Sequence, residues 1–452
     1  MKKSFYIGAL LLALPNILQN LITTSATLID NLMVGGLQEH AIAGVTITNQ
    51  VFFIFTIVLF GIGGTAGIFI PQYKGIGNEA KMTEAFKVSL VLSVAFAVVF
   101  AAIMFLIPTT ILSFFADDEY TIVAAIEYLY YIRWTFFILP ISLAIGNAYR
   151  FSGYVKTPMY IAFVTVSFGT VLNYALIGGN LGMPAMGVSG AALGTLIARS
   201  AELIIFIVLT FIIKSPVKIQ IHSFFKLEKV MFKQFIEKGY GLVINEFLWA
   251  FGMQLVTVIY TMRISENIAA MSITHTFSSL IFIGMGGVSV VFSLYLGQHL
   301  GRGKFDRAKA DAERLRKLSM FMGAGSGIVV FALSFLLIGF YDVAPDIIQT
   351  SQLLLAVNVG FSWLYYLNAS YFFILRSGGD TKGVLIIDSL FTWGVMIPGA
   401  FLIGRLGFVL PLHFLLVQSL EVIKYIMASR RYKKDSWLNN LTVDSEETVA
   451  SA

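Results

Sequence analysis

Long apolar segments bounded by charged residues recur along almost all of this 452-residue chain, and they constrain its fold more than any other feature. Twelve such segments are present, at 6–34, 42–71, 88–115, 121–148, 158–179, 187–213, 239–262, 268–298, 318–341, 346–374, 383–404 and 408–428. About 20 apolar residues in a helix span a bilayer. Only 12% of the residues are charged, whereas a soluble domain carries roughly a quarter. The sequence therefore predicts an all-α membrane protein with twelve transmembrane helices.

The lysines and arginines indicate how the chain crosses the membrane. If the N-terminus is inside, 27 of the 31 basic residues lie in inner segments. Outer loops contain only Arg263 and Arg405, while Arg133 and Arg199 fall within apolar segments. Cytoplasmic loops carry such an excess of positive charge. We therefore predict a multi-pass protein of the cell membrane with both termini cytoplasmic. The net charge of +6 follows from this distribution and gives no reason to expect nucleic acid as a partner.

The two halves of the chain resemble each other at a shift of 226 positions. IAGVTITN at 42–49 corresponds to IAAMSITH at 268–275, and the motif Q-x-x-G-x-G at 72–77 recurs at 298–303. Each half has six segments, so both halves begin on the same side and form parallel repeats related by an axis along the membrane normal. This arrangement predicts two six-helix lobes with a central cleft, and it favours a carrier that works by alternating access.

The predicted domains follow from the repeat. An N-terminal lobe covers 1–213, a cytoplasmic linker 214–238 and a C-terminal lobe 239–430, followed by a polar cytoplasmic tail at 431–452. The linker alternates basic and apolar residues, so it is either an amphipathic helix on the inner membrane surface or a solvated connection. The tail is polar from Asp435 onward, and we expect it to be disordered.

Asp30, Asn173 and Thr195 are predicted to form an ion-coupling site in the N-terminal lobe. They lie in three different apolar segments, and counting from the segment ends places them at a similar depth in the outer half of the membrane. Charged side chains within a membrane usually face the protein interior or a wet cavity. A carboxylate with an amide and a hydroxyl suits Na⁺, which prefers oxygen ligands, or a proton. The alternative is that Asn173 and Thr195 only hydrogen-bond neighbouring helices.

Four polar residues of the C-terminal lobe are candidates for a substrate or second-ion site. Asn245 and Glu246 lie mid-membrane, and the carboxylate suits a cationic substrate or a second coupling ion. Asp388 lies nearer the inner end of its segment and is expected to face the cytoplasmic vestibule. His275 is a candidate proton relay. For Asp388 and His275 the alternative is a purely structural role.

Enzyme signatures are absent from the sequence. There is no cysteine, which excludes disulfides and thiolate metal sites. There is no G-x-x-x-x-G-K-[ST] phosphate loop and no histidine pair at metal-binding spacing. We therefore predict a protein that is not an enzyme and has no cofactor. The only ion it is expected to bind is the coupling ion, H⁺ or Na⁺, at Asp30.

The order and duplication of several motifs resemble the multidrug and toxic compound extrusion (MATE) family over essentially the whole chain. The motifs are LALPNILQNLITTSATLIDNLMVGGL at 12–37, VLNYALIGG at 171–179, GVSGAALGTLIA at 187–198 and ILRSGGDTKG at 374–383. This resemblance implies two lobes of six helices and export of organic cations in exchange for Na⁺ or H⁺. It also implies a cation site at Asp30, Asn173 and Thr195. Many members have a second acid one turn after the asparagine, where this chain has Ile177, and this difference favours H⁺.

The predicted function is therefore secondary active efflux of organic, cationic amphipathic compounds in exchange for H⁺ or Na⁺. The alternative is a flippase for lipid-linked saccharides, which would need several basic residues in its cavity. Only Arg133 and Arg199 are predicted within the membrane, and Arg199 has Glu202 one turn away as an ion-pair partner. A receptor or scaffold would need a sizeable soluble domain, which the sequence lacks. The expected partners are small organic substrates and the lipid bilayer, and the protein is expected to be monomeric.

Overall fold

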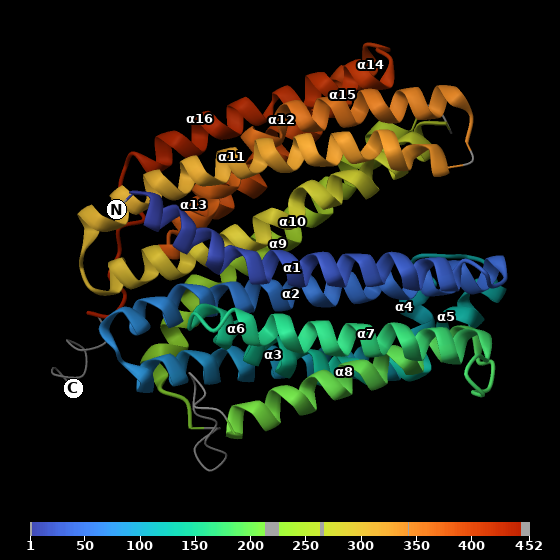
Figure 1. Ribbon diagram of the computed structural model, residues 1–452, viewed down its shortest axis with the longest axis horizontal. Helices are drawn as coiled ribbons and strands as arrows, with labels where there is room; N and C mark the ends of the chain where they lie inside the picture. Colours follow the sequence, from blue (N-terminus) through green and yellow to red (C-terminus); the bar gives the residue numbers. More distant parts are fainter. Residues whose placement is uncertain (1, 213–225, 263–265, 342, 444–452) are drawn as a thin grey trace. The chain divides into compact units, whose positions relative to one another are not determined.

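A computed structural model describes residues 2–212, 226–262, 266–341 and 343–443 (Figure 1). Eleven of its helices are long and apolar enough to cross a membrane. A bent pair, α5 (Glu119–Ile132) and α6 (Thr135–Phe151), makes twelve if it is counted as one span. The all-α membrane fold predicted from the sequence is therefore confirmed.

The other elements follow in chain order. They are α1 (Lys2–Val34), α2 (Glu39–Ile76), α3 (Glu79–Leu106), α4 (Pro108–Leu112), α7 (Lys156–Gly178), α8 (Gly187–Ile212), α9 (Lys229–Thr261), α10 (Glu266–Gly301), α11 (Phe305–Leu337), η2 (Ile338–Phe340), α12 (Pro345–Ser377), α13 (Thr381–Leu385), η3 (Ile386–Leu390), η4 (Thr392–Met396), α14 (Ile397–Arg405), α15 (Leu410–Ser419) and α16 (Glu421–Tyr432). Here η2 is a 3₁₀ turn, and η3 and η4 are π-helical.

The segment predicted as one helix over 121–148 is broken between α5 and α6, with a bend of 52°. At the break the hydroxyl of Thr135 donates to the carbonyl oxygen of Ile132 (2.6 Å). The N–H of Trp134 donates to the carbonyl of Tyr131, three residues earlier (3.3 Å). A threonine hydroxyl that takes a backbone carbonyl competes with the helical pattern, and three-residue bonds tighten the turn. The bend therefore has a local cause, which a hydropathy pattern does not record.

Helix bounds in the two halves support the internal repeat. Together α5 and α6 cover 119–151, and α12 covers 345–377, the same range shifted by 226 positions. Two pairs of glycines at this shift both adopt a positive φ: Gly77 (75°) with Gly303 (67°), and Gly153 (86°) with Gly379 (73°). Only glycine reaches this conformation at little cost. The repeat therefore extends from sequence motifs to the backbone of the helix ends.

The chain forms two compact units. Unit 1 comprises Met1–Ile17, Gly67–Gly77 and Ile236–Ala452, and unit 2 comprises Leu18–Ala66 and Asn78–Phe235. Both α1 and α2 thus contribute to each unit. The linker predicted at 214–238 is described only from 226, and its last residues already belong to α9; the part at 214–225 lies outside the described residues.

In unit 2, α7 and α8 lie side by side (Figure 1) and come close because α8 presents glycines to α7. A Cβ atom at Gly190 would meet the carbonyl of Leu176, and one at Gly194 would meet the side chain of Asn173. Small residues at such interfaces let membrane helices approach each other. The motif GVSGAALG therefore fixes the position of Asn173 relative to α8.

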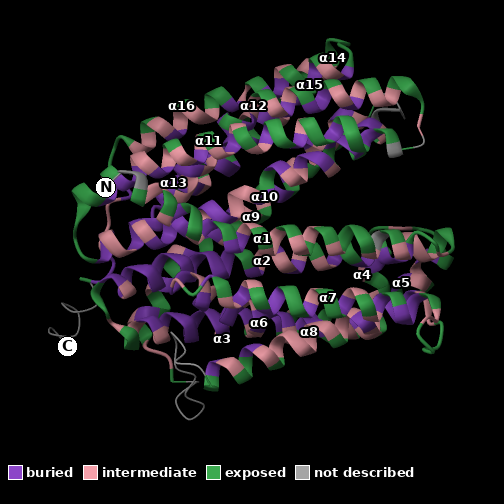
Figure 2. Ribbon diagram, in the orientation of Figure 1, coloured by how far each residue is buried: buried purple, intermediate pink, exposed green. Residues whose placement is uncertain are grey.

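In unit 1, α10, α11 and α12 pack against one another (Figure 1). Gly323 and Gly327 of α11 lie against Ser362 of α12, again with no room for a side chain. Figure 2 shows buried and exposed residues on the same helices, so each helix has a packed face and an exposed face. Large apolar side chains such as Leu106 (79% exposed) and Phe321 (67%) are on exposed faces. Such surfaces suit contact with lipid.

The last turns of α2 and α10, which carry the repeated Q-x-x-G-x-G motif, cross at close range within unit 1. A Cβ atom on Gly75 would lie 2.5 Å from the carbonyl oxygen of Gln298. On the other helix, a Cβ atom on Gly301 would meet the carbonyl of Gln72. Glycine is required at both places because backbone approaches backbone.

Replacing Gly75 by alanine is expected to destabilise the protein by about 1–3 kcal/mol, because the methyl group would force the two helices apart. Gly325→Ala is the matched control: this glycine also lies within a helix, but nothing occupies the space where a Cβ atom would stand. The control is expected to be neutral or to stabilise by up to about 1 kcal/mol. Thermal unfolding of both variants in detergent measures the difference, and equal melting temperatures would contradict the close crossing.

The polar tail, expected to be disordered from Asp435, is ordered as far as Val443. Trp437 is fully buried and stacks on Tyr432, with ring centroids 5.7 Å apart. Beyond it, the N–H of Leu441 donates to the side-chain oxygen of Gln72 (2.9 Å), and Thr442 donates to the carbonyl of Gly301 (3.2 Å). The prediction of disorder is wrong here because the tail completes hydrogen bonds at the crossing of α2 and α10, and composition cannot indicate such partners. Residues 444–452 lie outside the described residues.

Asp380, between α12 and α13, anchors the start of this tail. Its carboxylate accepts hydrogen bonds from Arg431 (2.8 Å to each oxygen) and from the hydroxyl of Ser436 (2.6 Å). Burial raises the pKa of Asp380, but these bonds and that from the N–H of Gly383 outweigh it, so the pKa lies below its usual value. The carboxylate therefore stays charged at neutral pH, and its contribution to stability is lost only as the pH falls through this lowered pKa.

Candidate functional site

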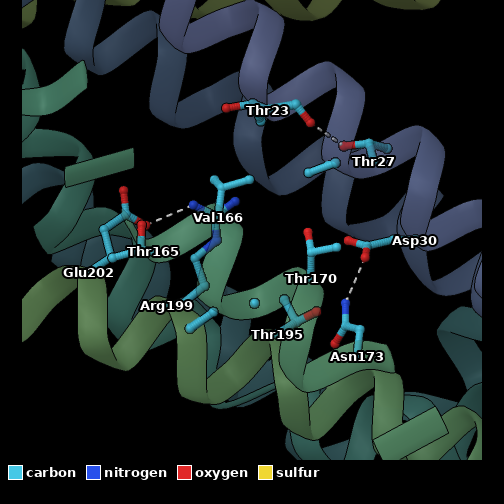
Figure 3. A pocket seen from close by; sticks show the side chains of 13 residues that line it. Thr23, Thr27, Asp30, Thr165, Val166, Thr170, Asn173, Thr195, Arg199 and Glu202 are labelled. Carbon is cyan, nitrogen blue, oxygen red and sulfur yellow. Dashed lines mark hydrogen bonds and ion pairs between the residues drawn. The ribbon is translucent and has the colours of Figure 1, made fainter. Parts of the chain in front are cut away.

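A pocket in unit 2 brings together the three predicted ion-coupling residues (Figure 3). It has a volume of about 80 Å³ and lies between α1, α7 and α8. Its lining residues are Thr23, Ala26, Thr27, Asp30, Thr165, Val166, Gly169, Thr170, Asn173, Thr195, Ala198, Arg199 and Glu202. The similar depth estimated from the sequence thus corresponds to a common site.

Asp30 and Asn173 form the polar centre of the pocket. The side-chain amide of Asn173 donates from Nδ2 to Oδ1 of Asp30 at 3.0 Å. Asn173 is only 3% exposed, and its Oδ1 has no hydrogen-bond partner among the described residues. A buried amide oxygen without a donor is costly. This oxygen lies against Gly194 of α8, so the amide presents its N–H to Asp30 and keeps its oxygen on the side of α8.

Threonines that the sequence analysis did not single out supply most of the remaining polar wall. Thr23 and Thr27 share a face of α1 with Asp30, because spacings of four and three residues fall on one side of a helix. Figure 3 shows Thr170 and Thr195 on the same side of the pocket as Asp30 and Asn173. The spacing T-x-x-x-T-x-x-D was the available signal for the α1 wall.

The opposite end of the pocket carries the ion pair predicted between Arg199 and Glu202, whose Nη1 and Oε2 atoms are 2.8 Å apart. These two charges cancel. Among the described residues, Asp30 accepts a bond only from the neutral amide of Asn173. With all three groups ionised, the pocket lining has a net charge of −1. Such a site attracts a monovalent cation, and its carboxylate, amide and hydroxyl oxygens are suitable ligands for a hard cation.

In unit 1 the structure brings Asn245 and Asp388 together, but the ammonium group of Lys424 is already paired with Asp388. Nζ of Lys424 lies 2.5 Å from Oδ1 of Asp388, and the amide of Asn245 donates to Oδ2 (3.1 Å). The hydroxyl of Ser389 donates to Oδ1 of Asn245 (2.8 Å). These four residues are called the Asp388 cluster below. Instead of opening to a vestibule, Asp388 is 8% exposed within the π-helical segment η3.

Lys424 is one of the 27 basic residues counted in the inner segments, but its side chain is 14% exposed and lies within the span Leu410–Tyr432. Glu246 is half-buried, and Arg376 and Asp388 are the charged groups that act on it. His275 is exposed on α10 and belongs neither to the pocket nor to the Asp388 cluster. Of the four candidates, the structure therefore joins Asn245 and Asp388 and leaves Glu246 and His275 outside the Asp388 cluster.

Comparison with known proteins links this arrangement to one family. The profile of the MatE family matches residues 15–175 and 243–402, one stretch in each half. The probable multidrug resistance protein NorM of Thermotoga maritima is 26% identical over 396 residues, covering 87% of this chain and 84% of that protein. The uncharacterized transporter YisQ of Bacillus subtilis is 22% identical over 410 residues, with 90% of each chain covered.

Solved structures have the same fold. An outward-facing structure of a multidrug resistance MATE family transporter superposes with a TM-score of 0.84 at 16% identity, covering 95% of this chain and 96% of that one. A MOP superfamily transporter from Pyrococcus furiosus gives the same TM-score and identity, with coverage of 94% and 96%. At this identity the likeness concerns the fold alone.

Proposed function

Because the chain belongs to the MatE family of membrane transporters, we propose that it is a secondary active efflux antiporter. It exports organic, cationic amphipathic compounds in exchange for H⁺ or Na⁺ by alternating access, with both termini in the cytoplasm. The observation that carries this proposal is the carboxylate of Asp30, which lines a pocket within the spanning helices. Its one hydrogen-bond partner in the described part of the chain is a neutral amide. An intramembrane carboxylate in a cavity is expensive unless it binds an ion.

The pocket suits exchange of a cation at Asp30. In the structure, Asn173 presents its N–H to the carboxylate. A half-turn of the amide would present its unpartnered oxygen instead, as a cation requires. Thr195 supplies a hydroxyl on the same side of the pocket (Figure 3). Ile177, one turn after Asn173 on α7, is apolar and supplies no further oxygen. With Asp30 as the one carboxylate at this end of the pocket, the set favours a proton over Na⁺.

In unit 1, Glu246 is the proposed contact for a cationic substrate or a second ion. Asp388 and Asn245 are less suited to that role, because Lys424 already neutralises the carboxylate. His275, which is exposed on α10, stays a predicted proton relay. A flippase for lipid-linked saccharides is not favoured, since the only basic side chain lining the pocket, Arg199, is paired with Glu202. A negatively charged pocket repels a phosphate.

Transport by proteoliposomes under one imposed gradient at a time tests the proposal. The vesicles contain the full-length protein and a fluorescent organic cation, and they receive either a pH gradient or a Na⁺ gradient. We expect the pH gradient alone to drive uphill movement of the cation. Uphill movement driven only by the Na⁺ gradient would identify Na⁺ as the coupling ion. Movement at the same rate with no gradient would contradict secondary active transport.

A further inference from the structure

Three of the five threonines that line the pocket already donate their hydroxyl hydrogens to backbone carbonyls. Oγ1 of Thr23 donates to the carbonyl of Gln19 (3.0 Å), and Oγ1 of Thr27 donates to the carbonyl of Thr23 (3.0 Å). On α7, Oγ1 of Thr165 donates to the carbonyl of Ile161 (2.9 Å). A hydroxyl has one hydrogen and two lone pairs. These three groups can therefore offer a ligand only acceptor lone pairs.

Asp30 adds to this acceptor wall. Its ionised carboxylate has no hydrogen to donate, and the side-chain amide of Asn173 already donates to this carboxylate. Thr170 and Thr195 can either donate or accept. The donors of Arg199 lie at the far end of the pocket, where the guanidinium faces Glu202 (Figure 3). Around Asp30 the pocket thus combines negative charge with a shortage of hydrogen-bond donors.

A ligand that matches this wall supplies both a positive charge and several donors. Resting on the transport function proposed above, we propose that the pocket binds the head group of a protonated primary or secondary amine, in preference to a quaternary ammonium or phosphonium ion. A quaternary cation neutralises Asp30 but leaves the oxygens of the wall without donors. Sites built to hydrogen-bond a ligand discriminate strongly against an analogue that lacks the matching group.

The dimensions of the pocket agree with a small head group. A cavity volume of about 10–15 Å³ is enough to hold one water molecule. The pocket volume of about 80 Å³ therefore accommodates an ammonium group with a few attached carbons. None of the described residues that line the pocket is aromatic. An aromatic cage is the usual means of recognising a quaternary ammonium ion. The small volume of the pocket and the lack of an aromatic cage in its lining therefore both favour a head group with N–H donors.

Two isomeric cations separate charge from hydrogen bonding. Tert-butylammonium and tetramethylammonium have the same formula and charge and nearly the same shape, but only the first has N–H donors. Their binding to the full-length protein in lipid nanodiscs is measured by isothermal titration calorimetry. We expect tert-butylammonium to bind at least about tenfold more tightly, as the loss of one or two charge-assisted hydrogen bonds implies. Equal affinities, or no binding of either cation, would overturn the proposal.

Replacing both Thr23 and Thr27 by valine removes two acceptors with little change of shape. We expect this double variant to lose most of the preference while it still binds tetramethylammonium as before, because Asp30 is retained. Thr46→Val is the matched control, since Thr46 makes the same kind of bond to Ile42 on α2 (2.8 Å) and does not line the pocket. An unchanged preference in the double variant would also contradict the proposal.

These outcomes are independent of the transport function. Efflux that requires Asp30, together with equal binding of the two isomers, would refute the preference for N–H donors and leave the antiporter standing. A clear preference, together with efflux that does not require Asp30, would support the binding site and refute its role in coupling.

Discussion

Replacing Asp30 by asparagine is expected to reduce gradient-driven efflux to the rate of vesicles without protein. The substitution removes the ionisable group of the pocket but keeps an oxygen that can accept the hydrogen bond from Asn173. We therefore expect the folded state to change in stability by no more than about 1 kcal/mol. Efflux of a fluorescent organic cation from proteoliposomes under a pH gradient measures the first effect, and thermal unfolding measures the second.

Asp117→Asn is the matched control, because Asp117 is exposed in the loop before α5 and lies outside the pocket. This control is expected to transport at the wild-type rate. If the Asp30 variant retained full gradient-driven efflux, the coupling role would be wrong. Glu246, the half-buried carboxylate of unit 1, would then be the next residue to test.

The second large effect is expected in unit 1, where Lys424→Met would leave Asp388 buried without its cation. Both side chains of this pair are less than 15% exposed. Removing one partner of a buried ion pair costs about 3–5 kcal/mol, because the remaining charge stays desolvated. We expect a correspondingly large fall in the melting temperature. The amide of Asn245 (3.1 Å from Oδ2) offsets only part of the loss.

Two further variants separate the ion pair from other effects of the substitution. Adding Asp388→Leu to Lys424→Met removes both charges, and most of the stability should return, since a buried pair is often replaceable by apolar residues. Lys309→Met breaks a pair with Asp435 whose side chains are 43% and 47% exposed. It should cost at most about 1 kcal/mol. A double variant as unstable as the single one would show that Lys424 acts through packing.

Much of the fold was predictable because the bilayer leaves few alternatives. Apolar length and charge asymmetry define spanning helices directly, and the motifs at 72–77 and 298–303 disclose the repeat. Asp30 was predictable for a related reason: a carboxylate inside an apolar segment is costly, so it points to a site. Its contact with Asn173, 143 positions away, was inferred only from similar depth.

What sequence reasoning missed depends on tertiary partners. Lys424 lies eight residues before the end of α16, where a basic residue looks like an ordinary inner-surface charge. Only the position of Asp388 shows that it is an internal cation. Thr23 and Thr27 were not predicted as pocket residues, because threonines in membrane helices commonly bond to their own backbone. Here that same bond determines which hydrogen-bonding role remains for a ligand.

The docked tail has a consequence for the order in which the protein assembles during synthesis. The N–H of Leu441 bonds to Gln72, 369 positions earlier in the chain. The end of α2 belongs to unit 1, whose remaining helices are almost all made after residue 235. While the first half of the chain is inserted, the last turn of α2 at Gly75 therefore has no contact with α10, which has not yet been synthesised. Unit 2 has all its segments by Phe235 and can pack early, whereas unit 1 gains this partner of Gln72 only after Leu441 has been synthesised.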